Sequence, residues 1–205
     1  MTEKIILASG SPRRRELLAM LGVPFIIKTS DAEEVMTGTD PSEVTEELSR
    51  QKAEAVVADH MPCAETKGGS FIIIGADTVV SVDGRILGKP ENREMAKEMI
   101  SDLQGRSHMV YTGVTLLRIH DDEKEYVTFS EGTRVNVAPM SESEILSYID
   151  TDEPYDKAGG YGIQGIFAKY IEGIEGDYFN VVGLPVHRLY EALKEMEVSC
   201  ENWNL

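Results

Sequence analysis

The chain has 205 residues and a formal net charge of −16 at pH 7, with 36 acidic and 20 basic side chains. This net charge argues against a nucleic-acid partner, which would require a basic face, although a locally basic site could bind a small polyanion. The sequence has no apolar run of membrane-spanning length and no signal-peptide pattern, and Cys63 and Cys200 form neither a disulfide framework nor a metal-ligand spacing. These features predict a cytoplasmic protein with no membrane partner.

The first segment predicts a strand, a turn and a helix. Residues 4–8 are a short apolar run, and Ser11 and Pro12 suit the N-cap and the first position of a helix. Three arginines at residues 13–15 then occupy the first helical turn, where the helix dipole is already positive. A turn with free N–H groups beside several guanidiniums suits a bound phosphate, and a solvated basic patch is the alternative.

Next come a short strand at residues 24–29 and an acidic loop at residues 30–34, which is either solvated or a source of metal ligands. Asp40 begins a long helix whose apolar stripe continues to residue 56. Lys52 lies on that stripe, so it either extends along the surface to reach water or points inward to a charge. A loop is expected at residues 67–70.

Residues 71–80 are the clearest core strand, because their continuous apolar character indicates burial on both faces. Asp77 interrupts this run at a place where a break in the strand is expected. A buried acid is costly unless it is paired, protonated or bound to a metal. A structural role, with backbone N–H groups as partners, is the alternative to a functional one.

Lys89 precedes a proline and is expected to be a fixed cation at a loop tip. The glycine-rich residues 155–165 form either a ligand pocket or a flexible loop. The other elements expected after the core strand are a hairpin at residues 79–87 that turns at Asp83-Gly84, a helix at 92–103, an antiparallel pair at 108–119 and 125–137 with its turn at 121–122, a helix capped by Ser141, short strands at 167–171 and 178–182, a helix at 186–196 and a frayed tail from 199.

Motifs in chain order resemble the Maf family of nucleoside triphosphate pyrophosphatases, also called septum formation inhibitors. They are Leu-Ala-Ser-Gly-Ser-Pro-Arg-Arg at residues 7–14, Gly-Ala-Asp-Thr-Val-Val at 75–80, Gly-Lys-Pro at 88–90, Asp-Lys-Ala-Gly-Gly-Tyr-Gly-Ile-Gln-Gly at 156–165 and Val-Gly-Leu-Pro at 182–185. The resemblance implies one domain over residues 1–205 with an α/β fold like that of inosine triphosphate pyrophosphatases. In that fold an elongated mixed β-sheet is flanked by helices, with two lobes around a central cleft. It also implies a homodimer.

The resemblance further implies cleavage of a nucleoside triphosphate to the monophosphate and pyrophosphate with a divalent metal, Mg²⁺ or Mn²⁺. Asp77 matches the family's catalytic acid, described as the proton acceptor, and with Glu34 is expected to bind the metal. The positions associated with the triphosphate are Ser9, Ser11, Arg14, Lys52 and Lys89.

Arg13, Thr78 and Gln164 resemble the family branch that acts on dTTP and UTP. The amide of Gln164 offers a donor and an acceptor, as does the O4/N3–H edge of uracil or thymine. Gly160 stands where relatives often carry Ala. Two alternatives are a non-catalytic nucleotide-binding regulator of cell division and an enzyme that removes modified pyrimidine nucleotides.

Overall fold

The computed structural model describes residues 3–60, 69–120 and 123–198. Within these ranges the strands form one seven-stranded mixed sheet in the order β2-β1-β3-β5-β6-β7, with β4 paired to β3. The strands are β1 (Lys4–Leu7), β2 (Phe25–Ile27), β3 (Ser70–Val82), β4 (Arg85–Leu87), β5 (Ser107–His120), β6 (Glu123–Val137) and β7 (Ile171–Glu175). β1 runs parallel to β2 and β3, and the other pairs are antiparallel.

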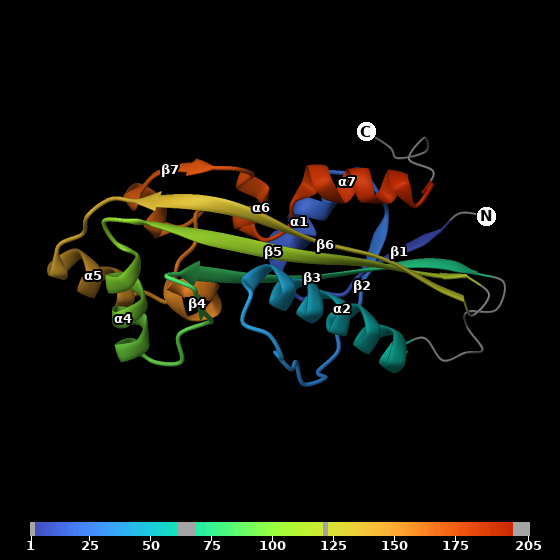
Figure 1. The fold of residues 1–205 in the computed structure, drawn as a ribbon, viewed down its shortest axis with the longest axis horizontal. Coiled ribbons are helices and arrows are strands. Elements are labelled where there is room, and N and C mark those ends of the chain that lie inside the picture. Colours follow the sequence, from blue (N-terminus) through green and yellow to red (C-terminus); the bar gives the residue numbers. More distant parts are fainter. Residues whose placement is uncertain (1–2, 61–68, 121–122, 199–205) are drawn as a thin grey trace.

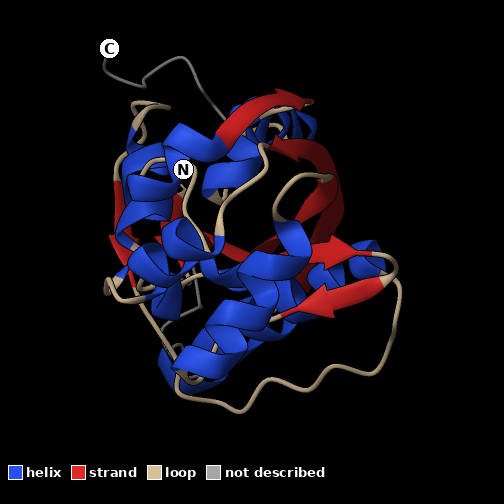
Figure 2. Cartoon of the chain, turned by 90° about the vertical axis from the view of Figure 1, so that its left-hand side faces the viewer, coloured by secondary structure: helices blue, strands red, loops and turns tan. Residues whose placement is uncertain are grey.

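Helices lie on both sides of this sheet, whose long strands β3, β5 and β6 run along most of the molecule (Figure 1 and Figure 2). The helices are α1 (Pro12–Ala19), α2 (Pro41–His60), α4 (Arg93–Leu103), α5 (Glu142–Ile149), α6 (Tyr178–Val182) and α7 (Val186–Glu195), with 3-10 turns at Glu153–Asp156, Ala158–Gly160 and Ile166–Tyr170. The mixed α/β fold is therefore as the sequence predicts.

The buried apolar side chains form separate clusters, which define two lobes of the molecule. In one lobe, α1 and α7 pack on one face of the sheet through Leu17 and Leu189, and α2 packs on the other face through Val56. In the other lobe, α4 and α5 pack around Val80 and the buried aromatic side chain of Phe167. No helix in the described part of the chain is long and apolar enough to cross a membrane.

Helix α2 lies unusually close to the sheet because two glycines leave room for it. A Cβ atom on Gly75 would lie 2.1 Å from the Ser49 carbonyl oxygen, and one on Gly113 would lie 2.1 Å from the Thr45 carbonyl oxygen. Asp77 is two residues after Gly75 and directly opposite Gly113. Because alternate residues of a strand lie on the same face of the sheet, the Asp77 side chain lies on the face that α2 covers. This close approach places Asp77 beside α2.

Three features of the sequence-based prediction are wrong. Residues 166–170 form a 3-10 turn and residues 178–182 form α6, because Glu153 accepts hydrogen bonds from the backbone at the start of the first and Asp177 caps the second, 2.9 Å from Phe179 N. β3 also continues through Asp77 without a break.

The other expected elements are present, and Ser141 and Glu144 form a reciprocal capping box at the start of α5. Residues 67–68 of the expected loop, the turn at 121–122, the tail from 199, Cys63 and Cys200 lie outside the described residues.

Candidate active site

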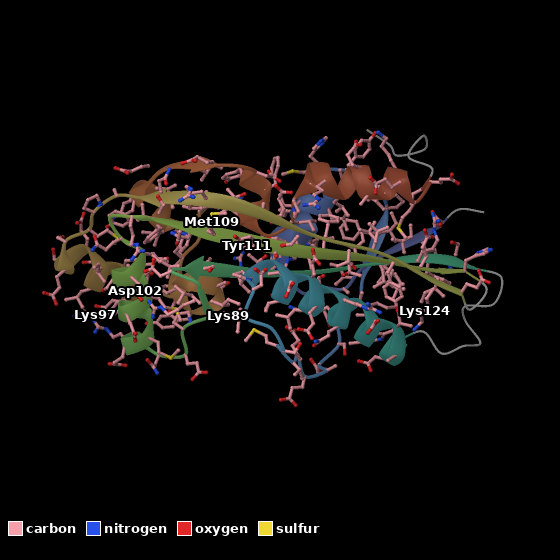
Figure 3. The ribbon with its side chains drawn as sticks, in the orientation of Figure 1. Lys89, Lys97, Asp102, Met109, Tyr111 and Lys124 are labelled. Atoms are coloured by element: carbon pink, nitrogen blue, oxygen red, sulfur yellow. The ribbon has the colours of Figure 1, made fainter. Side chains whose placement is uncertain are left out.

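A pocket of about 890 Å³ lies between the two lobes. Its wall is built from the turn before α1, the loop that carries Glu34, one side of α2, the middle of β3, the loop after β4 and residues 153–165. All ten site residues proposed from the sequence line this pocket: Ser9, Ser11, Arg13, Arg14, Glu34, Lys52, Asp77, Thr78, Lys89 and Gln164. In the view of Figure 3, Lys89 lies between α4 and α2.

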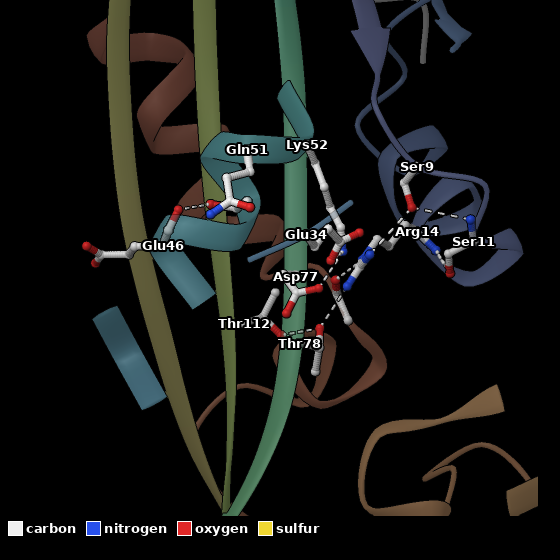
Figure 4. Close-up of polar contacts among 12 residues, drawn as sticks. Ser9, Ser11, Arg14, Glu34, Glu46, Gln51, Lys52, Asp77, Thr78 and Thr112 are labelled. Carbon is white, nitrogen blue, oxygen red and sulfur yellow. Dashed lines mark hydrogen bonds and ion pairs between the residues drawn. The ribbon is translucent and has the colours of Figure 1, made fainter. Parts of the chain in front are cut away.

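Lys52 is the centre of the charged part of the pocket. Its Nζ lies 2.5 Å from Asp77 Oδ1 and 3.1 Å from Glu34 Oε2 (Figure 4). The Lys52 and Asp77 side chains are only 21% and 14% exposed. Of the two orientations that the sequence leaves open, the structure therefore has Lys52 pointing inward to a charge. This pairing also explains why β3 tolerates an acid in its apolar run.

Arg14 connects the start of α1 to two distant segments. Its Nε donates to the Gly183 carbonyl oxygen at 2.9 Å, and its Nη2 donates to Thr78 Oγ1 at 3.0 Å. Nη1 lies 3.4 Å from Ser9 Oγ. Burial lowers the pKa of Arg14, and the charge of Asp77 partly opposes that shift. A guanidinium has five N–H donors, so these three contacts leave one N–H on each terminal nitrogen for a ligand.

Hydroxyl groups hold the surroundings of Arg14 in place. Ser11 caps α1 by accepting from Arg14 N at 3.4 Å, and Ser9 Oγ accepts from Ser11 N at 3.3 Å. Thr78 Oγ1 lies 2.9 Å from Thr112 Oγ1, which in turn donates to a backbone carbonyl of α6. Arg14 is thus fixed on the sheet side of the pocket.

The opposite wall comes from the other lobe. Arg13 Nη1 lies 3.5 Å from Asp156 Oδ2, which links α1 to the 3-10 turn across the pocket. Lys157 Nζ lies 2.5 Å from Asp156 Oδ1 and 2.8 Å from the Glu153 carbonyl oxygen. Gln164 is exposed on this wall, in the turn closed by the Gly165 N to Gly162 O hydrogen bond of 3.1 Å.

Glu153, Asp156, Lys157 and Gln51 also line the pocket but were not assigned roles from the sequence. Asp156 and Lys157 belong to the glycine-rich motif, so the sequence contained a signal from which their place in the site could have been predicted. Glu153 is one of 36 acidic residues and no local pattern distinguishes it.

Glu34 and Asp77 are the side chains most suited to a divalent cation. The described residues contain no group of three or more His, Cys, Asp or Glu side chains arranged to hold a metal ion. The two carboxylates nevertheless converge on the single ammonium of Lys52, so their negative charge is directed at one point. Two carboxylates, completed by water and substrate phosphates, match the oxygen coordination that Mg²⁺ usually has in enzymes.

Comparison with known proteins agrees with this arrangement. The family model described as Maf-like protein matches residues 4–196. The chain is 48% identical to the dTTP/UTP pyrophosphatase of Agathobacter rectalis over 202 residues, covering 95% of this chain and 98% of that protein. It is 45% identical over 196 residues to proteins of the same name from Lachnoclostridium phytofermentans and Bacillus cereus, covering 95% of this chain and 96% of each relative. With its motifs gathered in one pocket and the match spanning nearly its whole length, this chain belongs to the Maf family.

Proposed function

We propose that this protein is a nucleoside triphosphate pyrophosphatase that hydrolyses dTTP and UTP to the monophosphate and pyrophosphate. The observation that carries the proposal is the convergence of Arg14, Lys52 and Asp77 in one pocket, with Gln164 on its opposite wall. The relatives that are 45–48% identical and named dTTP/UTP pyrophosphatase support the same reaction and substrates.

The charges of the pocket suit a triphosphate, which brings about four negative charges near neutral pH. Arg14 retains two N–H donors, and Lys52 and the exposed Lys89 add two further cations. Ser9 and Ser11 shape the turn before α1, where a phosphate would meet backbone N–H groups. The protein as a whole carries a net charge of −16, so binding of the substrate requires locally placed positive charge, from these side chains or from a metal ion.

In the proposed reaction, Asp77 accepts a proton from the water that attacks the α-phosphorus. Lys52 and Arg14 stabilise the negative charge that develops on the departing pyrophosphate. Glu34 and Asp77 would hold Mg²⁺ or Mn²⁺, which when bound supplies positive charge at the phosphates and lowers the pKa of a coordinated water. Because Lys52 contacts both carboxylates, it also keeps them oriented toward the same point.

Base selectivity is assigned to Gln164, Arg13 and Thr78. The Gln164 amide can pair with the O4/N3–H edge of uracil or thymine. Arg13 links the two walls through Asp156 and can therefore close over the base or its phosphates. Thr78 acts through Arg14, since its hydroxyl is 3.0 Å from Arg14 Nη2.

The test is pyrophosphate release from a panel of canonical and modified nucleoside triphosphates, with Mg²⁺ or Mn²⁺ and with chelator. Metal-dependent release that is fastest for dTTP, UTP or a modified pyrimidine nucleotide supports the proposal. Nucleotide binding by calorimetry without turnover would instead support a non-catalytic regulator of cell division. A homodimer, a cytoplasmic location and the lack of a nucleic-acid partner remain predictions from the sequence, and light scattering tests the first.

A further inference from the structure

The carboxylate of Glu153 contacts the backbone just after Gln164. Glu153 Oε2 accepts a hydrogen bond from Ile166 N at 2.6 Å, and Oε1 accepts one from Phe167 N at 3.3 Å. The buried hydroxyl of Tyr148 lies 3.1 Å from Glu153 Oε1, which restrains the carboxylate from the other side. One side chain therefore fixes the first two N–H groups of the segment that follows the Gln164 turn.

Gly165 lacks a side chain where that carboxylate lies. A Cβ atom on Gly165 would be 2.2 Å from Glu153 Oε2 and 2.4 Å from Glu153 Cδ, far inside contact distance. The end of the glutamate side chain can move, so an alanine at this position would displace the carboxylate rather than prevent folding. The position of the Glu153 carboxylate therefore requires that residue 165 be a glycine.

The other end of the same turn is held in a similar way. A Cβ atom on Gly162 would lie 2.8 Å from Lys157 Cε, and Lys157 Nζ donates to the Glu153 carbonyl oxygen at 2.8 Å. The glycines that the sequence associates with close approach of a ligand are here approached by the protein's own side chains. Gln164 lies between these two fixed ends and is exposed to the pocket.

We propose that Glu153 is a positioning residue that sets base selectivity by fixing the turn from Gly162 to Gly165, and with it the direction of Gln164. The inference rests on the proposed function, in which Gln164 reads the uracil or thymine edge. A glutamine amide has a donor and an acceptor that exchange places when it rotates. Discrimination between bases therefore requires that the backbone beneath the amide be held in one orientation.

The experiment compares wild type with Glu153→Ala, Gly165→Ala and the double variant, using kcat and KM for UTP and GTP. Each single variant is expected to lower the UTP-to-GTP ratio of kcat/KM by about tenfold, the factor that corresponds to the net contribution of one hydrogen bond. The loss should appear in KM for UTP, because Asp77 and Lys52 lie on the other wall. Glu142→Ala, which removes an exposed glutamate on α5, is the matched control and should keep the wild-type ratio.

The double variant separates positioning from general destabilisation. Without the carboxylate, the added methyl group of Gly165→Ala has room, so the double variant should be no less selective than Glu153→Ala. Losses of selectivity that multiply in the double variant would overturn the inference. Single variants that keep the wild-type UTP-to-GTP ratio would overturn it as well. A wild type that shows no preference for UTP or dTTP over GTP would instead refute the proposed function, and this inference with it.

Discussion

Replacing Arg14 with lysine tests whether the guanidinium joins the start of α1 to β3 and to the residue that follows α6, as described. Arg14 contacts the Gly183 carbonyl, Thr78 Oγ1 and Ser9 Oγ at 2.9, 3.0 and 3.4 Å. A lysine has one ammonium on a flexible stem and can reach one of these acceptors at a time.

The magnitude follows from the lost contacts. A hydrogen bond to a charged group contributes about 1.5 kcal/mol, so the loss of two lowers the free energy of unfolding by about 2 to 3 kcal/mol, counting the long Ser9 contact as weak. In a protein of this size the midpoint of thermal unfolding then falls by roughly 5 to 10 °C. A lysine that reaches Thr78 or Ser9 leaves the buried Gly183 carbonyl without its donor, and the loss of stability is then at the upper end of this range.

Scanning calorimetry of Arg14→Lys and Arg15→Lys makes the comparison. Arg15 is the next residue of the same helix and is exposed, so its substitution should change the melting temperature by less than about 2 °C. Equal melting temperatures for the two variants would refute the structural role given to Arg14.

Three further outcomes are expected. Lys52→Met should lower UTP turnover by at least about 100-fold, because the positive charge next to Asp77 is lost. Lys97→Met, which changes an exposed lysine, is the control and should keep the wild-type turnover. Equal turnover of the two variants in a pyrophosphate assay would contradict the role given to Lys52. Gln164→Glu should weaken the preference for UTP and dTTP over GTP, and an unchanged preference would remove Gln164 from the base site. His108 is 3% exposed, and burial, followed by the Arg106 charge, lowers its pKa to about 4. The unfolded chain therefore binds more protons than the folded protein between about pH 4 and 6.5, so stability falls as the pH is lowered through this range. Between pH 7 and 5, wild type should lose about 2 kcal/mol more of its free energy of unfolding than His108→Gln, as measured by urea titration. Equal losses in the two proteins would refute the assignment.

Local signals in the sequence predict most of the fold. The Asp83-Gly84 turn, the cap at Ser141 and the long apolar run of β3 each depend on neighbouring residues, and all three are present in the structure. The site residues came from motifs far apart in the chain. Their meeting in one pocket follows because β1 and β3 are adjacent strands and α2 crosses the sheet beside Asp77.

Two of the three errors occur where a distant residue decides the local structure. Residues 166–170 are apolar and aromatic, which favours a strand, but Glu153 accepts hydrogen bonds from their first N–H groups and Phe167 is buried in an aromatic cluster. The uninterrupted path of β3 likewise depends on Lys52 from α2, which no pattern around Asp77 reveals. Asp177 before α6 was a local cap signal that could have corrected the prediction for residues 178–182.

The most direct test of the account is single-turnover hydrolysis of UTP by Asp77→Asn, with Asp102→Asn as control. Asp102 is paired with Arg85 at 2.6 Å outside the pocket, so its substitution weakens a more exposed ion pair without touching the proposed chemistry. Asp77→Asn is expected to bind UTP but to release pyrophosphate at least about 1,000-fold more slowly than wild type, whereas Asp102→Asn should match wild type. Hydrolysis by Asp77→Asn at the wild-type rate would contradict the assignment of the reaction to this pocket.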